Sequence, residues 1–222
     1  MRKTDNLIAR LAIFTVGLLI MSLGIVFLII SGFGASPWDV LHVGLYYQLG
    51  LTIGTWSILV GFAILGSAAI LMKEWPQFGA YLNMILIGLF IDMYMLLPFV
   101  TEPESWLGKI TMFIIGMVIY AYGMGIYLSA QLGSGPRDSF MLALQDKMGW
   151  KISNARRMME VTVLIVGWLL GGPVFIGTIV FSIVAGTFIG LALPQCQKIT
   201  DKILEKRMKD KLNKEIDRSA NI

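Results

Sequence analysis

The chain has 222 residues, of which 56% are hydrophobic and 14% are charged, and its mean hydropathy is +0.75. Soluble domains carry about 25% charged residues, so this composition excludes a soluble globular protein. The net charge of +4 does not indicate a nucleic-acid partner, because most of it lies in a C-terminal tail, residues 197–222.

Single copies of histidine and cysteine limit the chemistry of the chain. One cysteine, Cys196, excludes an intramolecular disulfide and a cysteine-rich metal site. One histidine, His42, argues against a histidine-based zinc site. We therefore expect no metal and no cofactor.

Apolar runs long enough to cross a bilayer, about 20 residues each, occur six times along the chain. The first run is longer than the apolar core of a signal peptide, which has about 7–15 residues, and no small-residue cleavage site follows it. We therefore interpret it as a retained helix. The six predicted crossings are residues 8–31, 53–72, 78–98, 107–130, 154–171 and 175–194.

Two of the links between these runs are long, residues 32–52 and 131–153. Each contains a helical segment of about a dozen residues, which is too short and too polar to cross a bilayer alone. The other links are short. We therefore predict one short helix after the first crossing and another after the fourth.

The distribution of Lys and Arg in the short loops orients the predicted helices, because cytoplasmic loops carry the excess of these residues. The N-terminal segment contains Arg2, Lys3 and Arg10, whereas link 32–52 contains no Lys or Arg. Link 131–153 is basic again. With six crossings, this pattern places both chain ends in the cytoplasm.

An internal repeat relates the two halves of the chain. The segment Gly34-Ala35-Ser36-Pro37-Trp38-Asp39 aligns with Gly133-Ser134-Gly135-Pro136-Arg137-Asp138 at an offset of 99 residues (133 − 34). The same ungapped offset pairs Gly17 with Gly116 and Gly24 with Gly123. Because three crossings are an odd number, the second copy must be inverted relative to the first, as in many secondary transporters.

The predicted fold is therefore all-α, with six transmembrane helices in two inverted three-helix repeats. Each repeat has a short capped helix after its first crossing. We assign residues 1–100 to the first repeat and 101–196 to the second. Residues 197–222 form a basic amphipathic cytoplasmic tail, which could lie on the inner leaflet or bind a protein partner.

These motifs resemble those of a known family. The repeated Gly-x-x-Pro-x-Asp element, the spacing Arg156-x-x-x-Glu160, and Gly171-Gly172 before Gly177-Thr178 are similar to the YczE/YyaS/YitT-like bacterial integral membrane proteins. The resemblance extends to about Pro194. It implies a bacterial plasma-membrane protein without a firmly assigned substrate, in a family sometimes linked to the production or export of secondary metabolites.

The repeated motif predicts a sharp helix start. Ser36 is the expected N-cap of the first short helix, Pro37 is its first helical residue, and Asp39 can accept from free amides. Gly135, Pro136 and Asp138 take the same positions in the second copy. Two interpretations stay open: a well-capped helix at the membrane interface, or a re-entrant helix whose N-terminus lines a cavity.

Charged residues are concentrated in the second copy. Arg156 and Glu160 are four residues apart and can pair on one helix face. We expect them to join Arg137 and Asp138 in an ionic cluster at the cytoplasmic mouth. The cluster could either fix the loop to the fifth crossing or bind a substrate or ion.

Three further side chains are candidates for ion or substrate binding. Asp92 lies within the third predicted crossing, where a carboxylate is expensive and often functional, although it could also extend toward the outer interface or bond to a neighbouring hydroxyl. Asp39 and His42 could form a proton-sensitive pair, although a single histidine near an interface is more often solvated. We interpret Trp38 as an interfacial anchor, and Tyr120 and Tyr127 as residues that pack helices together or face lipid.

These features favour a small secondary transporter or exporter of an unidentified small molecule. The alternative is a non-transporting scaffold or accessory subunit of a biosynthetic or export complex. An enzyme is not expected, because no catalytic triad, metal motif or phosphate loop is present. The expected partners are the lipid bilayer, a small-molecule substrate and a protein that binds the tail.

Overall fold

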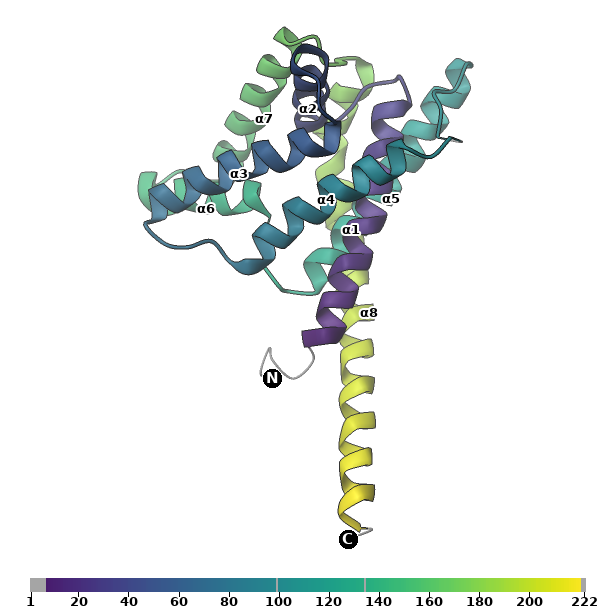
Figure 1. Cartoon of the computed structure of the whole chain (residues 1–222), viewed down its shortest axis with the longest axis vertical. Helices are drawn as coiled ribbons and strands as arrows, with labels where there is room; N and C mark the ends of the chain where they lie inside the picture. The colour runs from purple at the N-terminus through teal and green to yellow at the C-terminus, as the bar shows by residue number, and fades with distance from the viewer. Residues whose placement is uncertain (1–6, 99, 134, 221–222) are drawn as a thin grey trace.

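The computed structural model describes residues 7–98, 100–133 and 135–220, and this part of the chain contains helices and no strand (Figure 1). The helices are α1 (Leu7–Ile30), α2 (Pro37–Leu49), α3 (Ile53–Met72), α4 (Phe78–Met95), α5 (Trp106–Ser129), α6 (Pro136–Met148), α7 (Ile152–Leu169) and α8 (Ile176–Ala220). The predicted crossings fall on α1, α3, α4, α5, α7 and the first part of α8. The two predicted short helices are α2 and α6.

Five of these helices are long and apolar enough to span a membrane: α1, α3, α4, α5 and α8. Large apolar side chains such as Ile70, Leu169 and Ile183 are exposed on the outside of the bundle, where a bilayer would cover them. The chain is therefore a multi-pass membrane protein. The fifth predicted crossing, α7, has less membrane-like character because it contains Arg156, Arg157 and Glu160.

Helices α1 and α5 form the centre of the molecule. Gly17 of α1 faces Tyr127 of α5, and Gly24 faces Tyr120, so the two helices run antiparallel. A Cβ atom on either glycine would collide with the backbone of α5. Glycine therefore allows the close approach, as small residues do in other membrane bundles.

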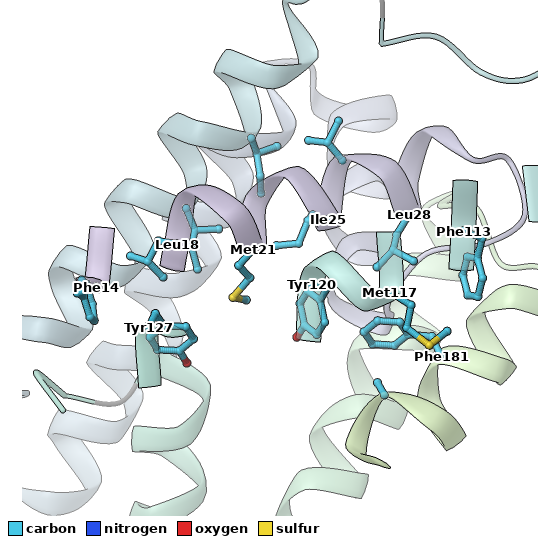
Figure 2. Close-up of a cluster of buried hydrophobic side chains, with 14 of the residues drawn as sticks. Phe14, Leu18, Met21, Ile25, Leu28, Phe113, Met117, Tyr120, Tyr127 and Phe181 are labelled. Atoms are coloured by element: carbon cyan, nitrogen blue, oxygen red, sulfur yellow. The ribbon is translucent and has the colours of Figure 1, made fainter. Parts of the chain in front are cut away.

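Apolar side chains fill the space around this pair. The core combines residues of α1 and α5 with Ile87 and Ile91 of α4 and Phe181 of α8. Figure 2 shows Leu18, Ile25 and other α1 side chains beside the aromatic side chains of α5, such as Tyr120 and Tyr127. The rings of Tyr120 and Phe181 meet edge to face at 5.3 Å.

The remaining helices make contacts both within each half of the chain and between the two halves. Helix α4 packs on α1 and α8 packs on α5, whereas α2 packs on α7 and α3 packs on α6. Helices α5, α6 and α7 begin 99 residues after α1, α2 and α3 (106 − 7, 136 − 37 and 152 − 53). The spacing of the sequence repeat is therefore also the spacing of the helices.

Both short helices begin as the repeated motif predicts. Proline occupies the first turn of each, and the Ser36 hydroxyl accepts from the Asp39 amide at 3.3 Å. The N-cap of α6 is Gly135, which offers no side chain to its free amides. Gly50 and Gly149 end the two helices with positive φ angles of 72° and 67°, which favour glycine.

The last helix continues without a backbone break through residue 197 into the predicted tail. In Figure 1 this part of α8 projects beyond the rest of the bundle. The Thr200 hydroxyl lies 2.6 Å from that of Ser129, and Leu204 is buried. The first part of the tail is therefore an extension of α8 that is attached to α5, rather than a separate domain.

A basic residue near the N-terminus connects α1 to α5. The Arg10 guanidinium donates to the carbonyl of Ala130, just after α5, at 2.9 Å. Arg2 and Lys3, which contribute to the predicted orientation, lie outside the described residues. The structure therefore ties the start of α1 to the end of α5.

Candidate functional site

The first turns of α2 and α6 meet inside the molecule. The Arg137 guanidinium lies over the Trp38 ring, 4.3 Å from its centroid, in a cation–π contact. The Trp38 side chain is 6% exposed. The interpretation of Trp38 as an interfacial anchor is therefore wrong, because the packing of α2 against α7 turns the indole inward.

Two cavities share this Trp38–Arg137 stack as part of their walls. Cavity A has a volume of about 80 Å³, and cavity B has a volume of about 70 Å³. The polar residues of cavity A are Asp39, His42, Ser57, Asn83, Arg137 and Asp138, together with Tyr120 and Tyr127. The polar residues of cavity B are Ser36, Arg137, Asp138, Arg156 and Glu160, together with Tyr120.

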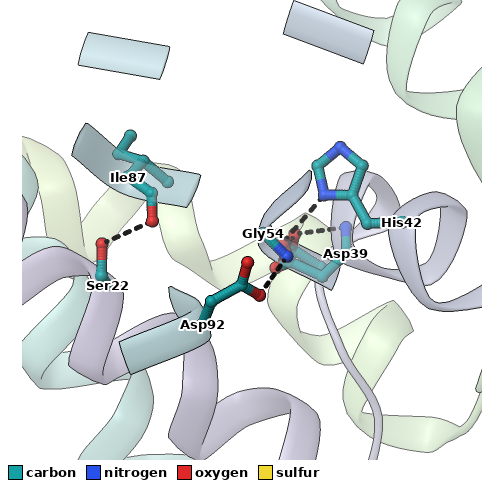
Figure 3. A network of polar contacts seen from close by, with 7 residues as sticks. Ser22, Asp39, His42, Gly54, Ile87 and Asp92 are labelled. Atoms are coloured by element: carbon teal, nitrogen blue, oxygen red, sulfur yellow. Dashed lines mark hydrogen bonds and ion pairs between the residues drawn. The ribbon is translucent and has the colours of Figure 1, made fainter. Parts of the chain in front are cut away.

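Asp39 and His42 of cavity A are buried rather than solvated. Each residue is 2% exposed, and the distance from His42 Nδ1 to Asp39 Oδ1 is 3.8 Å (Figure 3). The Ser36 hydroxyl donates to the Asp39 carboxylate. Burial lowers the pKa of His42, so its neutral form is favoured. The expectation of a solvated histidine is wrong, because α2 lies inside the bundle.

Asn83 is a polar residue of cavity A that the sequence analysis missed. It is 4% exposed, and its Nδ2 has no hydrogen-bond partner among the described residues. Its amide lies beside the N-cap of α6: a Cβ on Gly135 would be 3.1 Å from Asn83 Oδ1. The available signal was an amide side chain inside the apolar run 78–98.

Tyr120 and Tyr127 also line a cavity, which the packing interpretation did not predict. Both belong to the buried core, and both line cavity A. Tyr120 also lines cavity B. Their phenol groups therefore lie between the apolar core and the polar cavities.

The charged residues of cavity B form a pair rather than a four-membered cluster. Arg156 Nε donates to Glu160 Oε1 at 2.8 Å, as the four-residue spacing predicts. Arg137 has no acidic group of the described chain within 4.0 Å. Burial raises the pKa of Asp138, while Arg137, Arg156 and the Gly135 amide lower it in part.

Asp92 lies away from the two cavities, and its carboxylate accepts hydrogen bonds at the start of α3. Its Oδ1 accepts from the Gly54 amide at 2.8 Å, as Figure 3 shows, and its Oδ2 accepts from the Thr52 hydroxyl at 2.5 Å. A carboxylate at this position satisfies free amides and complements the positive end of the helix. The structure therefore brings together seven of the eight candidate residues and separates Asp92 from them.

Comparisons with known proteins agree with the resemblance seen in the motifs. A family model described as a family of unknown function, DUF6198, matches residues 8–194. The chain belongs to this family. The matched region of this chain includes both short helices and every residue named above as lining a cavity.

Three relatives cover most of the chain. The uncharacterized membrane protein YczE of Bacillus subtilis is 40% identical over 91% of this chain and 94% of its own length. The uncharacterized protein YyaS of the same organism is 33% identical over 81% of this chain and 90% of its own length. An uncharacterized protein of Haemophilus influenzae is 30% identical over 81% of each chain. No solved structure matches this DUF6198 family member.

Proposed function

We propose that this chain is a small secondary transporter or exporter that exposes cavities A and B alternately to the two sides of a bacterial plasma membrane. The observation that carries the proposal is the equivalence of the two cavities. Both are lined by the first turns of α2 and α6, and each has its own crossing helix, α3 for cavity A and α7 for cavity B. We propose a transport role rather than a catalytic one.

Residues 99 positions apart take corresponding places in the two cavities. Ser57 and Gly61 of α3 line cavity A, and their counterparts Arg156 and Glu160 of α7 line cavity B. Gly135 and Pro136 line cavity A, whereas Ser36 and Pro37 line cavity B. Trp38 and Arg137, which are counterparts of each other, line both. This correspondence supports an axis that relates the halves at the stack.

Helix packing supports two inverted repeats with three crossings each. Exchanging the halves converts the α1–α4 contact into α5–α8 and the α2–α7 contact into α6–α3. Gly17 faces Tyr127, and the counterpart pair Gly116 and Leu28 is also in contact. An antiparallel α1–α5 pair is what such an exchange requires. Secondary transporters often place their substrate site at the interface between repeats of this kind.

The two halves differ in a way that suits a transport cycle. Helix α3 packs closely on α4 through Gly54 and Gly88, whereas the counterpart helices α7 and α8 have few contacts in the described chain. Movement of α7 therefore meets less packing resistance than movement of α3. In this proposal, displacement of the Trp38–Arg137 stack opens one cavity as the other closes.

The scaffold alternative predicts a closed, apolar centre and a docking surface. Cavities A and B, with the five Asp, Glu and Arg residues named above, favour transport over this alternative. Both chain ends are proposed to be cytoplasmic, because the basic loops of the sequence are on that side. The protein partner of the tail belongs to the scaffold alternative.

Reconstitution tests the proposal directly. Purified protein in liposomes should move at least one compound of a small-metabolite panel when a pH gradient is imposed. Arg137→Gln should lower that flux by at least about tenfold, because a group lining both cavities loses its charge. Gly66→Ala, at a helix position with open space, should keep wild-type flux.

Two outcomes of the reconstitution experiment would contradict the proposal. Folded wild-type protein that moves no compound in either direction, under a pH gradient or a sodium gradient, would overturn the transport proposal. Equal flux in Arg137→Gln and wild type would overturn the role of the stack.

A further inference from the structure

We infer that cavity A binds the carboxylate of a small organic acid whose body is apolar. The inference rests on the proposed transport function and names the substrate class of the same site. Its basis is a group of unsatisfied donors at one end of the cavity, beside an apolar wall. The donors come from α4 and α6, which are distant in the sequence.

The first donors are backbone amides at the N-terminus of α6. The N-cap Gly135 has no side chain, and no side-chain hydrogen bond caps this helix. Pro136 occupies the first turn and has no N–H of its own, so the first amides available to a ligand are those of Arg137 and Asp138. Free amides and the positive end of the helix dipole together favour an anion.

Asn83 provides an independent indication of a ligand. Its Nδ2 is buried and lacks a partner in the described chain, and the side-chain amide as a whole lies beside Gly135 at the same cavity. An amide that stays buried without a hydrogen bond is destabilising, because it has lost its water partners and gained none. A ligand oxygen placed between Asn83 and the start of α6 would satisfy this donor and the free amides at once.

Arg137 provides the balancing charge. Its guanidinium lines the cavity and stacks on Trp38 without an acidic partner within 4.0 Å in the described residues. The two nearby carboxylates have favourable interactions of their own. The Ser36 hydroxyl donates to Asp39, and the Gly135 backbone lowers the pKa of Asp138 in part. Arg137 therefore remains available to a carboxylate that enters the cavity.

The rest of the cavity wall specifies the other end of the ligand. Val60 and Ile64 of α3, Met84 and Ile87 of α4, and Ile25 of α1 line the same space. An apolar body gains free energy by leaving water for such a wall. The predicted ligand therefore combines one carboxylate with a short hydrocarbon or aromatic body, and it is neither a sugar nor a cation.

Binding to purified full-length protein tests the inference without requiring transport. The probes are benzoate and hexanoate, their uncharged amides, benzylamine, chloride and inorganic phosphate. The carboxylates should raise the thermal unfolding midpoint in detergent and bind at least about tenfold more tightly than the amides, because hydrogen bonds to charged groups are stronger than those to neutral groups. Benzylamine should not bind.

Variants then locate the site. Asn83→Leu and Arg137→Gln should each weaken benzoate binding by about tenfold or more, because each removes a donor to the charged group. Asn83→Asp keeps the size of the side chain and should abolish binding through charge repulsion. Asn154→Leu and Arg157→Gln are the matched controls: both residues are exposed on α7, line neither cavity, and should bind benzoate as wild type does.

The outcomes separate this inference from the transport proposal. Equal binding of amides and carboxylates, or wild-type affinity in folded Asn83→Asp, would overturn the carboxylate site. Protection by chloride or phosphate but not by benzoate would replace the organic acid with an inorganic anion and overturn the inference. Carboxylate binding without flux would overturn transport alone, whereas flux of a compound that is not an acid, without carboxylate binding, would overturn only this inference.

Discussion

Glycine positions in this protein differ sharply in what surrounds them. A Cβ on Gly24 would meet the backbone of Tyr120 and Gly116, whereas a Cβ on Gly66 would meet nothing within 4 Å. Backbone cannot move aside as a flexible side chain can. The sequence shows both residues as glycines in apolar helices, and only the packing of α1 on α5 distinguishes them.

Substitution by alanine should therefore have opposite effects at these two positions. Gly24→Ala should destabilise the bundle by about 1–3 kcal/mol, because the added methyl group separates α1 from α5. Gly66→Ala should leave stability unchanged or raise it by up to about 1 kcal/mol, because alanine favours helix. Thermal unfolding of both variants in the same detergent provides the measurement. A Gly24→Ala variant as stable as wild type would contradict the close packing.

Helix α7 is the element whose relation to the membrane decides the topology. The other five long helices are long and apolar enough to cross a membrane, whereas α7 has two arginines in its second turn and includes Glu160. Pairing of Arg156 with Glu160 lowers the cost of placing these charges near the bilayer. The remaining residues of α7, from Val161 to Leu169, are apolar apart from Thr162, and many are exposed. We therefore expect α7 to cross with its charged end at the interface.

The number of crossings is testable because it determines where the chain ends lie. Six crossings place both ends on one side, whereas five place them on opposite sides. Reporter fusions at residue 1 and residue 222, active only on one side of the membrane, should give the same cytoplasmic result at both ends. Reporters on opposite sides would show that α7 does not cross. A fusion within the link between α4 and α5 should report the outer side as an internal control.

At the scale of the whole molecule, the two cavities and the stack between them form one arrangement. Val60 lines cavity A, and its counterpart Met159 lines cavity B. In an alternating-access mechanism, the two positions become accessible from opposite sides of the membrane. A scaffold with a closed centre would give neither position access to water.

Cysteine labelling in whole cells tests this arrangement. In a Cys196→Ser background, Val60→Cys and Met159→Cys should react with a membrane-impermeant maleimide from opposite sides of the membrane. Leu65→Cys is the control and should not react, because Leu65 is 1% exposed and lines neither cavity. Labelling of both cavity positions from one side would contradict the inverted relation of the two halves.

The candidate residues show where prediction from sequence ended. The Arg156–Glu160 pair and the Ser36 cap were predictable, because each partner lies within one helical turn of the other. The partners of Asp92 and Arg137 were not, since each is supplied by another helix. Asn83 was missed for the same reason: its importance depends on the start of α6, about 50 residues away in the sequence.

The sequence by itself determined the membrane environment, the helix positions and the repeat. Apolar runs must hydrogen-bond their backbone internally in lipid, and proline and glycine mark helix ends locally, so these features need no knowledge of distant contacts. Only the tertiary structure decided which polar groups share a cavity. Packing of α2 on α7 and of α3 on α6 buried His42, placed Trp38 under Arg137, and left Asn83 without a partner. Such meetings depend on how helices distant in the sequence fit together, which no local pattern encodes.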